Sequence, residues 1–238
     1  MAGVSRLQYT PDIKIIRLMC TGRLDPVIIA EAFIKGLDGL LVVGCHFGDC
    51  HYVNGNYHAK ARIDMVKKLF RHIGVNEERL DFKQCSSGEA ALFVEIVTEF
   101  DKKIRQIGPL GEGGDKLKKP EIFEKLQIAK RVLSGEKMRW VMGKRMPFLE
   151  SGNMYGEIFT EHEFNRAIDM IIVEETDVQA ILSKLEKSPA SVTELAQQLQ
   201  IPPERVFRYI LALKRKGFVE IKEIVDHVPK YQITQQGV

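Results

Sequence analysis

The side chains best suited to chemistry in this chain are its four cysteines. Cys45 and Cys50 form a Cys-x4-Cys loop directly after Leu40–Val43, an apolar run typical of a buried strand. Cys20 and Cys85 also follow predicted strands. The carboxyl ends of parallel strands meet at one edge of a sheet, where open α/β proteins bind their ligands. Because thiolates are the usual ligands of iron–sulfur clusters and structural zinc, the sequence predicts a metal or cluster site at this edge.

A second interpretation is that these cysteines are simply small, buried residues, since free cysteine is among the most buried types. The spacing of Cys45 and Cys50 favours ligand binding, Cys20 suits either role, and Cys85 suits the buried role slightly better. His46 and His51 flank the loop, and we expect them to be hydrogen-bonded neighbours of the site rather than ligands. A disulfide between the loop cysteines is geometrically feasible but is disfavoured in a reducing compartment.

Strands and helices alternate through the first 108 residues, which predicts an α/β fold with a small parallel, flavodoxin- or Rossmann-like sheet. Asp25 can cap a helix that begins at Pro26, and Ser86 and Glu89 have the spacing of a capping box. The expected strands are residues 13–19, 40–43 and 80–84. The expected helices are residues 26–36, 57–73 and 86–107.

The remaining chain divides at a glycine-rich linker, residues 108–114. We predict a helix over 120–133, no clear pattern over 134–174, and three helices followed by two strands over 175–238, which is a winged-helix-like arrangement. The predicted organisation is therefore an α/β iron–sulfur domain at 1–108, a connecting region at 109–174 and a winged-helix-like domain at 175–238. Basic and acidic residues nearly balance in the last domain, so docking to a protein is favoured over DNA binding.

Composition narrows the class of protein. With 35 basic and 32 acidic side chains, the formal charge of +3 is too small to indicate a nucleic-acid-coating or membrane-surface protein. No apolar run approaches the ~20 residues that cross a bilayer, and the N-terminus lacks the pattern of a signal peptide. We therefore expect a cytoplasmic protein without membrane contact, in which cysteines are thiols or metal ligands.

The chain resembles the delta subunit of methyl-viologen-reducing hydrogenase over about residues 3–108. The resemblance rests on three stretches in order: Arg6–Tyr9, Met19–Pro26, and Gly44–Tyr52 with Gly55–Tyr57. It implies a 2Fe–2S cluster with Cys20, Cys45 and Cys50 among its ligands. It also implies electron transfer between a hydrogenase, a formate dehydrogenase or a methylenetetrahydrofolate reductase and the flavoprotein subunit of a heterodisulfide-reductase-type complex.

One departure from the family pattern concerns the number of ligands. Family members usually begin with a further strand ending in Cys-x-x-Cys, which precedes the point where this chain starts, and Cys85 lies where the family has a small residue. Three inherited cysteines do not complete a four-thiolate cluster. Three explanations are open: a truncated gene model, ligands from a separate polypeptide, or completion of the site by Cys85 or a histidine.

Three functions follow as expectations. The first is a non-catalytic electron-transfer subunit of an oxidoreductase complex in anaerobic metabolism, since the sequence has no dinucleotide-binding fingerprint, P-loop or nucleophile–base motif. The second is a redox- or metal-responsive DNA-binding regulator. The third is an assembly scaffold stabilised by zinc, which is the weaker cofactor alternative.

Overall fold

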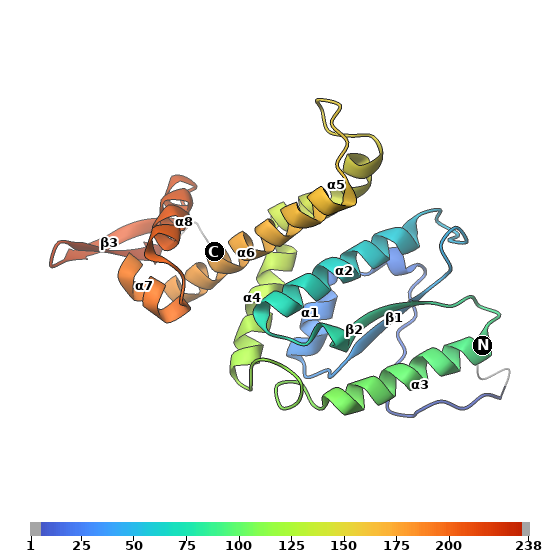
Figure 1. Ribbon diagram of the computed structural model, residues 1–238. Coiled ribbons are helices and arrows are strands. Elements are labelled where there is room, and N and C mark those ends of the chain that lie inside the picture. The colour runs from blue at the N-terminus through green and yellow to red at the C-terminus, as the bar shows by residue number, and fades with distance from the viewer. Residues whose placement is uncertain (1–5, 235–238) are drawn as a thin grey trace. The chain divides into compact units, whose positions relative to one another are not determined.

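The computed structural model describes residues 6–234 and contains both helices and short sheets (Figure 1). The chain divides into two compact units, Met1–Asp169 and Met170–Val238. The boundary falls inside the long helix α6, Glu161–Leu185. Among the described residues, no helix is both long enough and apolar enough to cross a membrane.

The first unit is built around two parallel strands, β1 (Leu40–Gly44) and β2 (Leu80–Gln84). Their register pairs the first residue of one strand with the first residue of the other, and the last with the last. The ladder continues one residue further, because the Cys85 N–H donates to the Gly44 carbonyl at 2.8 Å. Both strands therefore deliver a cysteine to the same carboxyl edge, as the sequence predicted for Cys45 and Cys85.

The helices of this unit begin and end where the sequence provides capping groups. Helix α1 (Pro26–Ile34) starts after Asp25, whose carboxylate accepts the Val27 N–H at 3.0 Å. Helix α2 (Gly55–Ile73) ends at Gly74, which adopts the left-handed conformation that a glycine tolerates. The two helices pack through Phe33 and Phe70, whose rings meet edge to face at 5.0 Å. Figure 1 shows α2 and α3 (Ala90–Ile107) on opposite sides of the two strands.

Two predictions for the first unit are wrong. Residues 13–19 are not a strand: no ladder pairs them within residues 6–234, and Ile16 and Met19 are 82% and 74% exposed. An apolar run indicates burial, but a strand also needs a backbone partner. Cys20 consequently caps a short 3-10 turn, η1 (Thr21–Arg23), rather than ending a strand.

Helix α3 begins at Ala90, four residues later than the predicted capping box. The Glu89 carboxylate does accept the Ser86 N–H at 2.6 Å, which is half of that motif. The same carboxylate also bonds to His46, and residues 86–89 form a turn before the helix. The contact therefore stabilises the loop after β2 and not the first turn of the helix.

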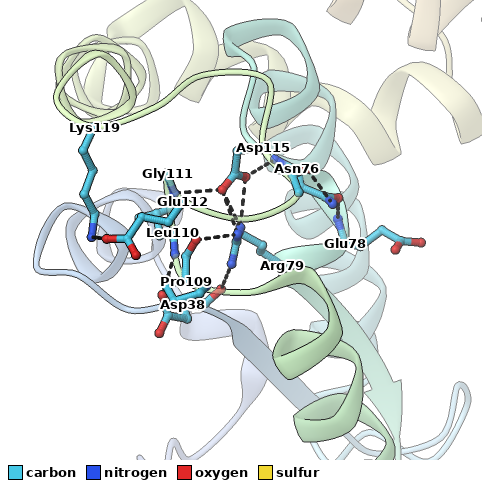
Figure 2. A network of polar contacts seen from close by, with 11 residues as sticks. Asp38, Asn76, Glu78, Arg79, Pro109, Leu110, Gly111, Glu112, Asp115 and Lys119 are labelled. Carbon is cyan, nitrogen blue, oxygen red and sulfur yellow. Dashed lines mark hydrogen bonds and ion pairs between the residues drawn. The ribbon is translucent and has the colours of Figure 1, made fainter.

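A buried arginine holds the amino ends of both strands to the connection that follows α3 (Figure 2). Arg79, fully buried just before β2, pairs with the equally buried carboxylate of Asp115 at 2.7 Å. Its guanidinium also donates to the carbonyls of Asp38, just before β1, at 2.9 Å and of Pro109 at 3.2 Å. The connection thus becomes part of the first unit and leads into α4 (Glu121–Ser134) and α5 (Glu136–Glu150).

The second unit follows the predicted order of three helices and an antiparallel hairpin. After α6 come α7 (Val192–Leu199), α8 (Pro203–Arg215), β3 (Val219–Val225) and β4 (Val228–Ile233). Ser191 and Glu194 form a reciprocal capping box at the start of α7, as their spacing indicates. The core of this unit contains, among others, Ile181, Leu195, Val206, Ile210 and Tyr231. The element order is compatible with a winged helix, which stays a prediction.

We expect Arg79→Gln to lower the free energy of unfolding by about 3–5 kcal/mol, because it leaves a buried carboxylate without its cation. Urea unfolding of the full chain measures this change. Arg71→Gln is the matched control: Arg71 is 62% exposed and pairs with Glu77 at the surface, so its loss should cost less than ~1 kcal/mol. Equal effects of the two substitutions would contradict the structural role of Arg79.

The same pair predicts a pH dependence. Burial raises the pKa of Asp115, but hydrogen bonds from Arg79 and from the N–H groups of Asn76 and Gly111 outweigh burial and hold the pKa below its ordinary value of 3.8. A depressed folded-state pKa stabilises the fold above the unfolded pKa, and this contribution is lost as pH falls through the folded value. The stability difference between wild type and Asp115→Asn should therefore shrink below pH ~4.

Candidate functional site

Three of the four cysteines lie together at the carboxyl edge of β1. Cys45 follows β1, Cys50 lies in the loop leading to α2, and Cys20 precedes η1. The sulfur atoms of Cys20 and Cys50 are 3.9 Å apart, and Cys50 is close enough to Cys45 to raise the pKa of the Cys45 thiol. The structure therefore brings together the three cysteines that the sequence singled out first, from segments up to 30 residues apart.

Hydrogen bonds from backbone N–H groups lower the pKa of the Cys50 thiol. Burial raises the pKa of Cys50, but hydrogen bonds from the N–H groups of Tyr52 and Asn56, and from the Cys20 and Cys45 thiols, outweigh burial and lower it overall. Burial and the neighbouring Cys50 raise the pKa of Cys45. Of these two loop cysteines, Cys50 is therefore the one whose surroundings favour the thiolate.

Two glycines allow the segments that carry these thiols to touch. A side-chain carbon on Gly55 would lie 2.5 Å from the Cys20 sulfur and 3.3 Å from the Cys50 sulfur. A side-chain carbon on Gly22 would lie 2.8 Å from the Gly55 backbone. The shortest distance at each position leaves no room for a Cβ unless backbone or sulfur is displaced. The cradle around the thiols therefore requires glycine at both positions.

Asn56, which the sequence reasoning did not single out, anchors the loop. It is fully buried in the first turn of α2. Its amide nitrogen donates to the carbonyls of Cys45 at 3.1 Å and His46 at 2.7 Å, and it lies 3.6 Å from the Cys45 sulfur. The sequence did contain a signal for Asn56, since it is a polar residue on an otherwise apolar helix face. Such a buried amide is expected to form hydrogen bonds with nearby groups.

Cys85 is buried close to this edge but turns its thiol elsewhere. Its sulfur donates to the carbonyls of Ser86 at 3.5 Å and Glu89 at 3.4 Å, and burial raises its pKa. His46 bonds to the Glu89 carboxylate at 2.8 Å, as expected of a neighbour of the site. In the part of the chain that the structure describes, no group of three or more His, Cys, Asp or Glu side chains is arranged around a single metal-ion position.

Apolar side chains in and just after the Cys45–Cys50 loop are exposed. Phe47 stacks on Tyr57 with ring centroids 4.5 Å apart, and both are about two-fifths exposed. Val53 is 79% exposed and has a φ of +65°, a conformation in which a β-branched residue is strained. Strained backbone persists where the surroundings impose it, and such residues cluster at functional sites. We therefore regard the exposed residues Phe47, Val53 and Tyr57 as a candidate contact surface.

We expect Val53→Asn to raise the free energy of unfolding by roughly 1 kcal/mol, because asparagine tolerates the left-handed conformation better than valine. Thermal or urea unfolding of the full chain measures the change. Val225→Asn is the matched control, since Val225 is also exposed but lies in strand β3. That variant should be neutral or slightly less stable than wild type, and a stabilisation equal to that at position 53 would argue against strain.

Comparison with known proteins finds relatives of the first part of the chain. A family model for the delta subunit of methyl-viologen-reducing hydrogenase matches residues 1–108. The iron-sulfur subunit of the F420-non-reducing hydrogenase of Archaeoglobus profundus is 45% identical over 109 residues, which is 46% of this chain and 80% of that protein. The iron-sulfur subunit of the vhc F420-non-reducing hydrogenase of Methanococcus voltae is 42% identical over 108 residues, covering 45% of this chain and 75% of that protein.

A further relative is a larger protein. It belongs to the ferredoxin:CoB-CoM heterodisulfide reductase of Methanosarcina mazei, and it is 40% identical over 111 residues, which is 47% of this chain but 14% of that protein. All three matches cover slightly less than half of this chain. The family model thus covers residues 1–108, which include all four cysteines, and the chain belongs to the methyl-viologen-reducing hydrogenase delta subunit family.

Proposed function

We propose that this chain is an electron-transfer subunit that holds an iron–sulfur cluster, of the 2Fe–2S type, in a cytoplasmic oxidoreductase complex. The observation that carries the proposal is the convergence of Cys20, Cys45 and Cys50 from separate segments, with a glycine cradle behind them. These residues fit three of the four thiolate positions of such a cluster. A bound cluster supplies one-electron oxidation and reduction.

The protein's own part is to hold and tune the sulfur ligands. N–H groups directed at Cys50 stabilise negative charge on its sulfur, and hydrogen bonds to sulfur raise the reduction potential of a cluster. The Asn56 side chain donates hydrogen bonds to the carbonyls of Cys45 and His46 at the start of the loop. These bonds hold Cys45 in position. Phe47, in the same loop, stacks on Tyr57 of α2 and so ties the loop to that helix.

The proposed partners follow from the names of the relatives. The electron donor is a hydrogenase, and the acceptor is a heterodisulfide-reductase-type flavoprotein, because the relatives are named as parts of these two kinds of enzyme. Formate dehydrogenase and methylenetetrahydrofolate reductase are alternative partner enzymes in place of the hydrogenase.

We assign the second unit to protein docking rather than DNA binding. The outer face of α8 exposes Phe207 and Leu211 beside Arg208, and a helix that reads the major groove presents mainly polar side chains to bases. This assignment separates the proposal from a DNA-binding regulator. A salt-sensitive gel shift on the gene's own promoter that changes on oxidation would support the regulator instead.

Iron analysis tests the cofactor directly. After anaerobic purification with co-expressed partner proteins, we expect acid-labile sulfide, stoichiometric iron and an EPR signal on reduction. Cys20→Ser, Cys45→Ser and Cys50→Ser should each lose most of the iron, because serine is a poor replacement for a thiolate. Cys85→Ser decides whether Cys85 is the further ligand: loss of iron would make it one, and retention would exclude it.

A colourless, iron-free protein from the co-expressed complex would overturn the proposal, and stoichiometric zinc in place of iron would favour the zinc scaffold.

Two glycine substitutions test the cradle around the thiols separately. Gly55→Ala should reduce bound iron severalfold, because its new Cβ would overlap the Cys20 sulfur. Gly88→Ala is the control: no atom lies within 4 Å of the Cβ it would add, so iron content should not change.

A further inference from the structure

A cavity of about 310 Å³ opens beside the turn that follows Cys20. Its walls come from η1, the start of α1, the middle of α2, the end of α4 and the first half of α5, all in the first unit. The volume is at the lower end of the range typical of small-molecule sites, roughly 300–1,000 Å³. A ligand the size of a mononucleotide fits this space.

The cavity carries more positive than negative charge. Arg23, Arg62 and Arg139 line it, with Asp25 as the only acidic lining residue that the structure describes there. Asp25 is already engaged: one carboxylate oxygen accepts the Val27 N–H at 3.0 Å, and the other pairs with Arg139 at 2.9 Å. Two guanidinium groups are therefore left without a balancing carboxylate at the cavity wall.

The two uncompensated arginines retain donors for a ligand. Arg62 donates through one terminal nitrogen to the carbonyls of Gly22 at 2.5 Å and Leu24 at 3.4 Å, which fixes the guanidinium at the wall. Arg23 is exposed, and its side chain makes no hydrogen bond or ion pair within residues 6–234. Fork-shaped guanidinium groups bind phosphate through two parallel hydrogen bonds, which makes arginine the preferred residue for this anion.

Apolar methionine side chains line another part of the cavity. Met65 and Met138 are 3% and 1% exposed, and Met142 lies one helical turn beyond Met138 in α5. Thioether sulfur makes favourable contacts with aromatic rings and adapts to their shape. Guanidinium groups and thioether walls in one cavity match a molecule that has both a phosphate and an aromatic ring.

We propose that this cavity binds a mononucleotide-sized phosphate ester, with the phosphate on Arg23 and Arg62 and the base against the methionines. The site is distinct from the thiols but shares the η1 turn with them, since the Gly22 carbonyl that holds Arg62 lies two residues after Cys20. Occupancy of the cavity would therefore stabilise the turn that positions Cys20. The proposal does not depend on which electron donor or acceptor the chain serves.

Calorimetric titration of the full chain, purified anaerobically, tests the ligand class. The probes are adenosine and uridine 5′-monophosphates, adenosine, and inorganic phosphate. At least one nucleotide should bind with submillimolar affinity, and adenosine and phosphate should each bind about tenfold more weakly or worse, because each lacks one half of the recognised chemistry. Absence of binding by both nucleotides, or equal binding of the nucleotide and free phosphate, would overturn the proposal.

Two substitutions with opposite expected effects locate the site. Arg23→Gln should weaken nucleotide binding about tenfold, since it removes a charged donor. Arg166→Gln is the matched control, because Arg166 is exposed on α6 and does not line the cavity. Asp25→Asn should tighten binding severalfold, because asparagine still caps α1 while the competing negative charge disappears. Equal weakening by Arg23→Gln and Arg166→Gln, or weaker binding by Asp25→Asn, would place the nucleotide elsewhere.

Discussion

The buried ion pair between Arg79 and Asp115 is the interaction on which the arrangement of the first unit depends. One guanidinium, just before β2, contacts the carbonyl before β1 and the connection after α3. It therefore joins the amino ends of both strands and fixes their starting points. Because the strands are parallel and of equal length, fixing their amino ends also fixes where their carboxyl ends, and the cysteines that follow them, emerge. A buried charge pair is a costly way to gain stability, but it is well suited to specifying one register.

At the carboxyl edge, the constraint is steric rather than electrostatic. The backbones of η1 and α2 approach so closely that neither can carry a side chain at the contact. This contact brings Cys20 to a pair of cysteines that the strand and its loop already hold near each other. The loop itself is anchored by the amide of Asn56, and backbone N–H groups lower the pKa of Cys50. The close approach of the segments thus depends on Gly22 and Gly55, the position of the loop on the Asn56 side chain, and the lowered pKa of Cys50 on backbone N–H groups.

Most of this arrangement was predictable from the sequence, and the exceptions have identifiable causes. Periodicity and capping residues located β1, β2 and α1, since Leu40–Val43 and Asp25–Pro26 are local signals. The error at residues 13–19 arose because strand formation depends on a partner that local sequence does not reveal. The error at Ser86 arose because Glu89 also bonds to His46, a contact between residues 43 positions apart. Arg79 was missed for the same reason, since its partners Asp38, Pro109 and Asp115 lie in distant segments. Asn56 is different, because its partners Cys45 and His46 lie in the loop just before its helix.

The two-stranded sheet has a consequence for how the protein behaves in isolation. Each strand of such a pair keeps one edge whose N–H and C=O groups take no part in the described ladder. Residues 13–19 add a segment outside any helix or strand, with the aliphatic side chains of Ile15 and Ile16 exposed to solvent. Unprotected edges and exposed aliphatic residues are templates for pairing between chains. A preparation in which these edges stay uncovered would accordingly be prone to self-association, and the association would increase with protein concentration.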